Sequence, residues 1–125
     1  MRRLTESDWI RLREAVWRDL PFAPPFQRKD RQAALPEPAE FETDVTYLGD
    51  WDEGLDPLDT LEWIRVRPRR LRSRGRLVAP EMLDCETEFL ALLDRERITW
   101  TRRGDCIWIF ADPDTGAFSQ PQTGS

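Results

Sequence analysis

The stretch ITWTRRGDCIWIF at residues 98–110 constrains the fold of this chain more than any other segment. Two runs rich in β-branched and aromatic residues flank Gly104-Asp105, and such a dipeptide is typical of a two-residue hairpin turn. The stretch therefore predicts two antiparallel strands whose register is set by the turn. The predicted register pairs Arg103 with Cys106, Thr101 with Trp108, and Thr99 with Phe110.

This register sorts the hairpin side chains onto two faces, because residues opposite each other in an antiparallel pair share a face. One face carries Trp108 and Phe110, together with threonines and Cys106. The other face is more apolar, and we expect it to point into the core. Its members are Ile98, Trp100, Ile107, Ile109 and Ala111.

Alternation of apolar and polar residues predicts two further strands. The first is FETDVTYL at residues 41–48, and the second is LEWIRVR at residues 61–67. In the second strand Ile64 and Val66 share one side, so Trp63, Arg65 and Arg67 point to the other. Pro68 ends this strand or places it at an edge of the sheet.

Helical spacing predicts two helices. A capping box from Thr5 to Asp8 begins the first, which ends near Leu20 because prolines follow. The segment PFAPPF that comes next is expected to be extended, and residues 27–40 to form a loop or a short helix. The second helix is predicted to begin at Pro80-Glu81 and to bury Met82, Cys85, Phe89 and Leu92.

The elements occur in the order α-β-β-α-β-β. This order predicts an α+β fold with a four-stranded antiparallel sheet and two main helices packed on one face. We expect a single domain over residues 1–111 and a loosely ordered tail over residues 112–125. The predicted core includes Trp9, Val16, Val45, Tyr47, Ile64, Val66, Phe89, Leu92, Ile107 and Ile109.

Charge is divided unevenly along the chain, whose net charge is −5. Residues 37–62 hold ten acidic residues and no basic one, and residues 65–76 hold seven arginines and no acidic residue. If the strands at 41–48 and 61–67 pair, Glu42 and Asp44 lie against Arg65 and Arg67 and partly neutralise them. The later arginines have no such partners, and they are predicted to form an exposed basic loop: Arg69, Arg70, Arg72, Arg74 and Arg76.

The usual chemical signatures of an enzyme are missing. The chain has no histidine, and neither Cys85 nor Cys106 has a distinctive activating neighbour in sequence. The acidic segment from Asp50 to Leu61 fails the calcium-loop pattern, which needs glycine at the sixth position and glutamate at the twelfth. We expect no catalytic residue, metal or cofactor, and we expect both cysteines to be small buried hydrophobic residues. Because no signal peptide or membrane span is recognisable, a cytoplasmic location is expected.

The outer face of the sheet is the predicted partner-binding surface. If both hairpins join one sheet, this face gathers aromatic and arginine side chains, which are enriched at interface hot spots. An alternative is that the PFAPPF segment or the C-terminal tail with Phe118 covers the face. The predicted partner-binding residues are Trp63, Arg65, Arg67, Trp108 and Phe110.

Four segments carry a resemblance to known proteins: WRDLPFAPPFQRKD (17–30), DVTYLGDW (44–51), EWIRVRPR (62–69) and DCETEFLALL (84–93). On these residues the chain resembles a family of small, uncharacterised, single-domain bacterial proteins. The resemblance covers most of the chain, from the first helix to the last hairpin. It implies a bacterial, cytoplasmic protein, and it brings no activity and no catalytic residues.

These observations favour a non-enzymatic protein-interaction module, and a toxin-neutralising (immunity-type) protein is its most concrete form. Another protein is the expected partner, rather than nucleic acid or a membrane, and the oligomeric state stays open. The alternative is a nucleic-acid accessory protein that uses the Arg65–Arg76 basic run. An enzyme of unknown class ranks third.

Overall fold

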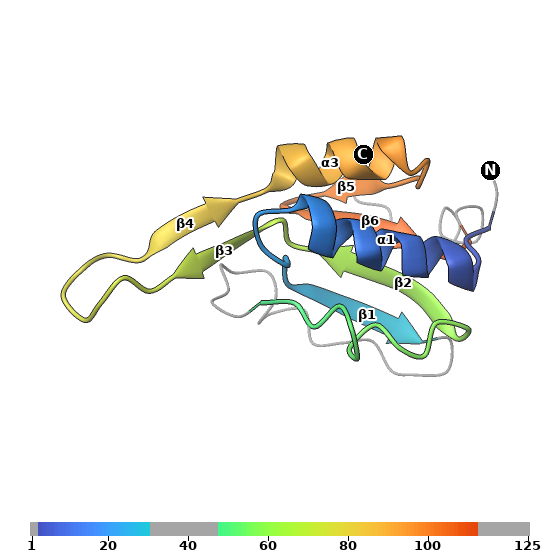
Figure 1. The fold of residues 1–125 in the computed structure, drawn as a ribbon, viewed down its shortest axis with the longest axis horizontal. Helices are drawn as coiled ribbons and strands as arrows, with labels where there is room; N and C mark the ends of the chain where they lie inside the picture. Colours follow the sequence, from blue (N-terminus) through green and yellow to red (C-terminus); the bar gives the residue numbers. More distant parts are fainter. Residues whose placement is uncertain (1–2, 31–47, 113–125) are drawn as a thin grey trace.

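The computed structural model describes residues 3–30 and 48–112. A four-stranded antiparallel sheet has the strand order β1-β2-β6-β5, with β1 at Phe26–Asp30, β2 at Leu61–Val66, β5 at Thr101–Arg103 and β6 at Cys106–Phe110. Helices α1 (Glu6–Asp19) and α3 (Glu86–Arg95) pack on one face of this sheet (Figure 1). Strands β3 (Arg69–Arg72) and β4 (Glu81–Asp84) form a separate two-stranded sheet. The predicted α+β fold with both helices on one face is confirmed.

Helix α1 begins as its sequence predicts. The Asp8 backbone N–H donates to Thr5 Oγ1 at 3.3 Å, and the Thr5 backbone N–H donates to Asp8 Oδ2 at 2.8 Å. The capping box thus satisfies two backbone donors that the first turn would leave without a partner. The helix ends at Asp19, two residues before Pro21.

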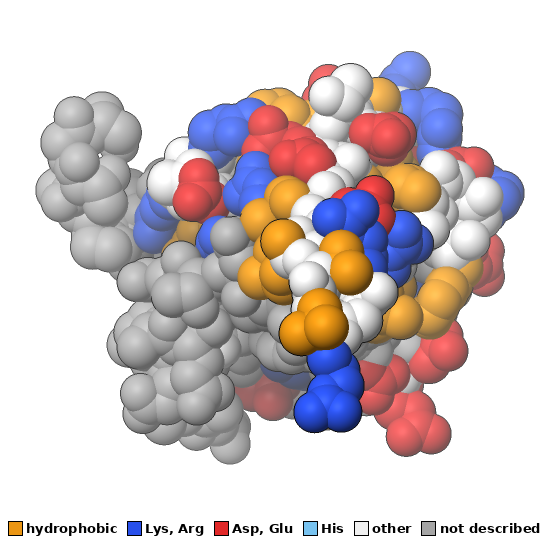
Figure 2. All heavy atoms as spheres, turned by 90° about the vertical axis from the view of Figure 1, so that its left-hand side faces the viewer, with side chains coloured by type: hydrophobic (Ala, Val, Ile, Leu, Met, Phe, Trp, Pro, Cys, Tyr) orange, Lys and Arg blue, Asp and Glu red, His pale blue; other side chains and the backbone are white. Residues whose placement is uncertain are grey.

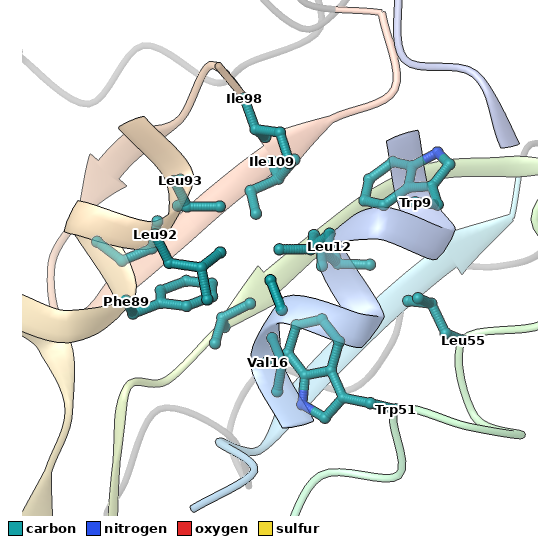
Figure 3. Packing of buried hydrophobic residues seen from close by; sticks show 14 of the residues in the cluster. Trp9, Leu12, Val16, Trp51, Leu55, Phe89, Leu92, Leu93, Ile98 and Ile109 are labelled. Atoms are coloured by element: carbon teal, nitrogen blue, oxygen red, sulfur yellow. The ribbon is translucent and has the colours of Figure 1, made fainter. Parts of the chain in front are cut away.

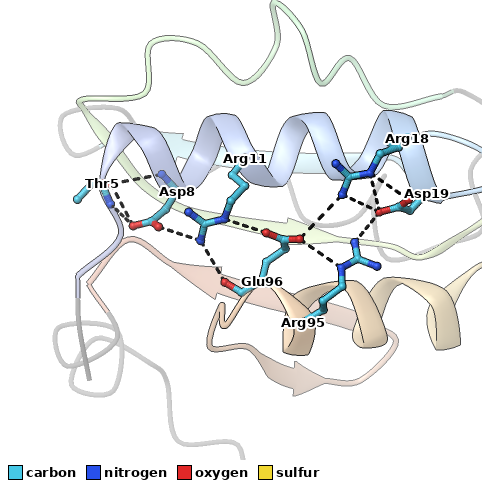
Figure 4. A network of polar contacts seen from close by, with 7 residues as sticks. All are labelled: Thr5, Asp8, Arg11, Arg18, Asp19, Arg95 and Glu96. Carbon is cyan, nitrogen blue, oxygen red and sulfur yellow. Dashed lines mark hydrogen bonds and ion pairs between the residues drawn. The ribbon is translucent and has the colours of Figure 1, made fainter.

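Ion pairs join the exposed sides of the two helices (Figure 4). The Arg11 side chain donates to Glu96 Oε1 at 2.8 Å and to the Glu96 carbonyl at 3.1 Å. Arg95 contacts both Glu96 and Asp19, so the C-terminal end of α3 is tied to the C-terminal end of α1. The helix pair is therefore held by a polar seam at the surface and by the core beneath it.

The first strand is not where the sequence predicts it. Phe26–Asp30 forms β1, which pairs with β2 and places Gln27 opposite Arg65 and Arg28 opposite Ile64. The prediction of a loop or short helix from residue 27 onward is wrong for residues 27–30. The strand QRKD has no apolar alternation, so only its partner strand reveals it. Most of the predicted strand 41–48, including the core candidates Val45 and Tyr47, lies outside the described residues, and Leu48 is exposed and outside any strand.

The predicted start of the second helix is also wrong. Residues 81–84 form strand β4, and α3 begins at Glu86, with Cys85 as its N-cap residue. The Cys85 N–H donates to the Pro68 carbonyl at 2.8 Å, which continues the pairing of the two strands up to the helix. Met82, predicted to be buried, is consequently 42% exposed.

The core lies between the two helices and the sheet (Figure 3). The eight residues of the predicted core list that lie in the described part of the chain are all buried, whereas Met82 is exposed and Trp100 is half-buried. Trp51 is a core residue that the sequence pattern does not predict, since it lies in a loop of acidic residues. Its side chain is fully buried, its Nε1 donates to the Pro24 carbonyl at 2.8 Å, and its ring contacts Phe26 and Phe89.

Among the described residues, no helix has the length and apolar character that a membrane crossing requires.

Candidate functional site: an aromatic sheet face and a projecting arm

The outer face of the sheet gathers the predicted aromatic and arginine residues. Trp63 lies opposite Phe110 and Arg65 opposite Trp108 in the β2–β6 pairing. The ring centroids of Trp63 and Trp108 are 4.6 Å apart, and those of Trp108 and Phe110 are 6.0 Å apart. The hairpin register is confirmed for Arg103 with Cys106 and Thr101 with Trp108, which brings these rings to one face. Strand β5 begins at Thr101, so the third predicted pair, Thr99 with Phe110, falls outside it.

Arginine side chains stack on these rings. The Arg65 guanidinium lies 5.6 Å from the centroid of Trp108, and that of Arg103 lies 4.7 Å from the same centroid. Arg65 Nε also donates to Gln27 Oε1 of β1 at 2.9 Å. Burial lowers the pKa of Arg103, because the charged form loses contact with water. Arg103 is not among the predicted partner-binding residues, although its pairing with Cys106 places it on this face.

Most of this face is shielded from solvent. Trp63 and Phe110 are each 7% exposed, Arg65 is 6% exposed and Arg67 is 4% exposed. Only Trp108 among the five predicted partner-binding residues is half-buried. The face is therefore a packed layer of rings and guanidinium groups with little area open to a partner. Phe26 of the PFAPPF segment packs with Trp51 on the core side, and Phe118 lies outside the described residues.

Both cysteines sit in environments that keep their thiols protonated. Burial raises the pKa of the Cys85 thiol to about 12, and burial also raises the pKa of Cys106. A nucleophilic or metal-binding cysteine needs the thiolate, so neither thiol is prepared for that chemistry at neutral pH. Within residues 3–30 and 48–112, no three His, Cys, Asp or Glu side chains are grouped so that they could hold a metal ion.

The first part of the basic run forms a strand, which corrects the prediction of a loop. Arg69–Arg72 is β3, and its residues lie opposite Asp84, Leu83, Met82 and Glu81 of β4. Arg69 contacts Asp84 and Glu86 at 3.3 Å each, and Arg72 pairs with Glu81. Arg67 lies 3.8 Å from Asp105. Within the described residues, the carboxylates that pair with Arg67, Arg69 and Arg72 come from residues 81–105. The predicted partners Glu42 and Asp44 lie outside the described residues.

Strands β3 and β4, with residues 73–80 between them, form a ribbon that projects from the body of the protein; we call this ribbon the arm (Figure 1). Every residue from 72 to 80 is exposed. Leu77 is 99% exposed, Val78 is 49% exposed, and Met82 at the start of β4 is 42% exposed. The view onto the end of the arm shows apolar side chains beside arginine side chains (Figure 2).

The arginines at the end of the arm differ from those at its base. Arg74 donates from Nε to the Ala79 carbonyl at 3.1 Å, a contact within the arm itself. Neither Arg74 nor Arg76 forms an ion pair with a carboxylate in the described part of the chain. The end of the arm therefore combines uncompensated positive charge with exposed apolar side chains. The sequence placed the arginines here, but the position of Leu77 and Val78 at the end of a projection required the structure.

The comparisons with known proteins show a family. The model of a family of unknown function (DUF6678) matches residues 4–111. Neither the curated proteins nor the solved structures include a match to the chain.

Proposed function

The chain belongs to this family of unknown function, so membership assigns no activity, and we propose that the protein is a non-enzymatic protein-interaction module that docks through its arm. The observation that carries this proposal is the 99% exposure of Leu77 at the end of the arm, next to the exposed Val78. A scattered exposed apolar residue needs no explanation, but an apolar pair at the end of a projection is placed for contact.

Physical magnitudes support a docking role for these side chains. Burying a Leu or Val side chain completely stabilises a complex by roughly 1.5–3 kcal/mol. The folded monomer gains little of this, because Leu77 is 99% exposed and Val78 is 49% exposed. A two-stranded ribbon is also marginally stable by itself, so the arm depends on its anchor at Arg69 and Cys85. The side chains at the end of the arm make no contacts with the hydrophobic core.

The most concrete form of this function is a toxin-neutralising (immunity-type) protein. Small size, a net charge of −5 and the absence of histidine support it, since such a protein works by covering another protein rather than by catalysis. The buried aromatic face formed by Trp63, Trp108 and Phe110 then serves as the rigid base of the docking element rather than as the contact surface.

A nucleic-acid accessory role is the second candidate, because Arg74 and Arg76 lie at the end of the arm without carboxylate partners in the described part of the chain. Phosphate binding needs several such cations along one face. Arg69 and Arg72 contribute little uncompensated positive charge to such a face, because each is paired with a carboxylate of β4. The protein-interaction role therefore accounts for more of the arm.

Photo-crosslinking in the native cell tests both candidates. A photoreactive amino acid replaces Leu77, and the control carries the same group at Thr87, which is exposed on α3. We expect a protein adduct of defined mass from position 77 and none from position 87. A nuclease-sensitive adduct from position 77 would instead support the nucleic-acid role. Adducts of equal yield from both positions, or none from position 77, would contradict docking through the arm.

A further inference from the structure

The exposed large hydrophobic residues of the described chain fall into two groups. Leu77, Val78 and Met82 belong to the arm. The other three are Ile10 at 37%, Trp17 at 52% and Leu48 at 52% exposure. These three lie on α1 and at the start of the loop 48–59. We call the surface formed by residues 10–17 of α1 and by loop residues 48–59 the acidic face. Arg13, which lies between Ile10 and Trp17 on α1, donates to the Asp52 carbonyl at 2.9 Å and holds the helix beside the loop.

The acidic face carries the opposite charge to the end of the arm. Its loop exposes five carboxylates, on Asp50, Asp52, Glu53, Asp56 and Asp59. Arg13 contacts Asp56 at 3.5 Å and is the one cation that forms an ion pair with this loop in the described residues. The Trp17 Nε1 donates to Asp52 Oδ1 at 3.0 Å, which fixes the indole ring among the carboxylates. The face thus presents exposed apolar side chains within a negative rim.

The two surfaces do not meet within one molecule. Leu77 is 99% exposed, so nothing in its own chain covers it. The base of the arm is fixed by Arg69, which contacts carboxylates of both β4 and α3. Figure 1 shows the arm directed away from the body, while the loop that follows residue 48, drawn in green, runs along the body. Contact between arm and acidic face therefore requires two molecules.

We propose that the end of the arm docks on the acidic face of a second copy of this chain. Leu77 and Val78 of one copy cover Trp17 and Leu48 of the other, and Arg74 and Arg76 lie opposite its loop carboxylates. This inference rests on the proposed function, in that the arm is a protein-docking element, and it names the partner. A second copy is the partner that fits, because the end of the arm is positively charged and the acidic face of the same chain is negatively charged.

Direct pairing of two arms is the less favourable way to join two copies. Antiparallel pairing of β4 with its copy, centred between Met82 and Leu83, would place Glu81 opposite Asp84 of the other copy, and the same pairing of β3 would place Arg69 opposite Arg72. Like charges opposite each other destabilise a strand pair. Reciprocal docking of each arm on the other copy's acidic face avoids this and closes a two-fold dimer. It also doubles the area buried by a single contact.

Sedimentation analysis of the purified full chain over a concentration series tests the proposal. We expect reversible self-association that weakens as salt is added, because exposed charges carry part of the contact. In the arm variant Arg74→Glu with Arg76→Glu, and in the face variant Glu53→Lys with Asp59→Lys, the dissociation constant should rise by about tenfold or more. The control Glu88→Lys, at an exposed site on α3, should associate as the unmodified chain does.

Mixing the two variants makes the test specific. An equimolar mixture brings an arginine arm to a carboxylate face and a glutamate arm to a lysine face, so the mixture should associate more tightly than either variant alone. Leu77→Asp should also abolish association while its circular dichroism spectrum stays unchanged. A chain that remains monomeric at all concentrations, or variants whose mixture stays monomeric, would overturn the proposal.

The outcome separates this inference from the proposed function. Monomeric protein that still forms a foreign-protein adduct at position 77 would end the self-association proposal and leave the arm as a docking element. Monomeric protein that binds duplex DNA or vesicles of anionic phospholipid through Arg74 and Arg76 would end it as well, and would replace the protein partner. Crosslinks from position 77 to residues 48–59 of another copy would support it directly.

Discussion

At the residue scale, Trp51 shows how a loop supplies part of the core. The ring is fully buried, and its Nε1 donates to the Pro24 carbonyl at 2.8 Å. Gly49 makes this possible, because a Cβ at that position would collide with the Pro24 carbonyl and with the Trp51 indole nitrogen. A single tryptophan thus ties the acidic loop to the segment that precedes β1.

We predict that Trp51→Ala lowers the free energy of unfolding by about 3–5 kcal/mol, which is typical of large-to-small substitution of a buried aromatic residue. Trp17→Ala is the matched control, since Trp17 is 52% exposed, and it should cost far less. Urea denaturation followed by circular dichroism measures both. Equal losses in the two variants would contradict the core role of Trp51.

The Cys85 thiol is expected to make the free energy of unfolding depend on pH in the alkaline range. Burial is the largest cause that raises its pKa to about 12, from an ordinary value of 9.0. Between these two values the unfolded chain releases the thiol proton while the folded chain keeps it. The unfolded state is then favoured increasingly, so the stability contributed by this group is complete below pH 9.0 and is lost as pH rises toward 12.

We predict that the free energy of unfolding of the unmodified chain falls with pH above about 9, with a slope approaching 1.4 kcal/mol per pH unit from this thiol. Cys85→Ala should be less stable at neutral pH, because it loses buried volume, but its alkaline slope should be smaller. Urea denaturation at a series of pH values measures the difference in slope. Parallel curves for the two proteins would show that Cys85 does not titrate as its burial implies.

At the element scale, Glu86 joins the arm to the rest of the fold. It lies in the first turn of α3, where its carboxylate accepts two hydrogen bonds from Arg102 of β5, both at 2.8 Å. It also contacts Arg69 of β3 at 3.3 Å. The hydrogen bonds from Arg102 are the largest cause that lowers the pKa of Glu86 below its usual range. One carboxylate therefore orients β3, α3 and β5 relative to one another.

We predict that Glu86→Gln is less stable than the unmodified chain above pH 4.5, the ordinary pKa of this group. A lowered pKa contributes stability that is present above the ordinary value and is lost as pH falls through the lowered one. The difference between the two proteins should therefore shrink in acid. Thermal melting from neutral to acidic pH measures it. Glu88→Gln, an exposed neighbour on the same helix, is the control, and a pH-independent gap for Glu86→Gln would contradict the prediction.

At the scale of the whole molecule, the described part of the chain consists of an α+β body from which the arm projects (Figure 1). The body holds all the residues of the main core cluster, and the end of the arm holds none of them. The residues that stabilise the fold and the residues that we propose to dock thus lie in different parts of the molecule. Such a division allows the end of the arm to change with little effect on folding.

We predict that replacing residues 73–80 by Asn-Gly leaves the free energy of unfolding unchanged or slightly higher. Arg72 lies opposite Glu81, so a two-residue turn can close the ribbon, and a shorter loop costs less entropy to close. Thermal melting checks the stability, and sedimentation checks the loss of self-association. A loss of stability as large as that of Trp51→Ala would show that the end of the arm supports the fold.

Several elements of this protein follow from patterns of residues that are close together in the sequence. The turn Gly104-Asp105 set the β5–β6 register, because a two-residue turn leaves few ways to align its strands. The capping box at Thr5 set the start of α1, and the alternation of β2 set which of its side chains face the core. These features depend on residues close in sequence, so the sequence alone contains the reason for them.

Tertiary structure decided the elements whose partners are distant in sequence. Strand β1 has a polar sequence and forms because β2 offers it a ladder of backbone partners. Glu81–Asp84 has residues suited to a helix, yet its backbone pairs with β3 and it forms a strand. Trp51 enters the core because Pro24 and Phe89, far away in the chain, complete its pocket.

Some features of the arm follow from its sequence, and others follow only from the fold. Its arginines were evident from the sequence as the run of residues 65–76. The pairing of Arg69 and Arg72 with carboxylates, and the exposure of Leu77 at the far end, depend on which strands meet in three dimensions. Charge is a property of each residue, whereas its neutralisation is a property of its neighbours. The sequence therefore determined how much positive charge the arm carries, and the fold decided where that charge remains available to a partner.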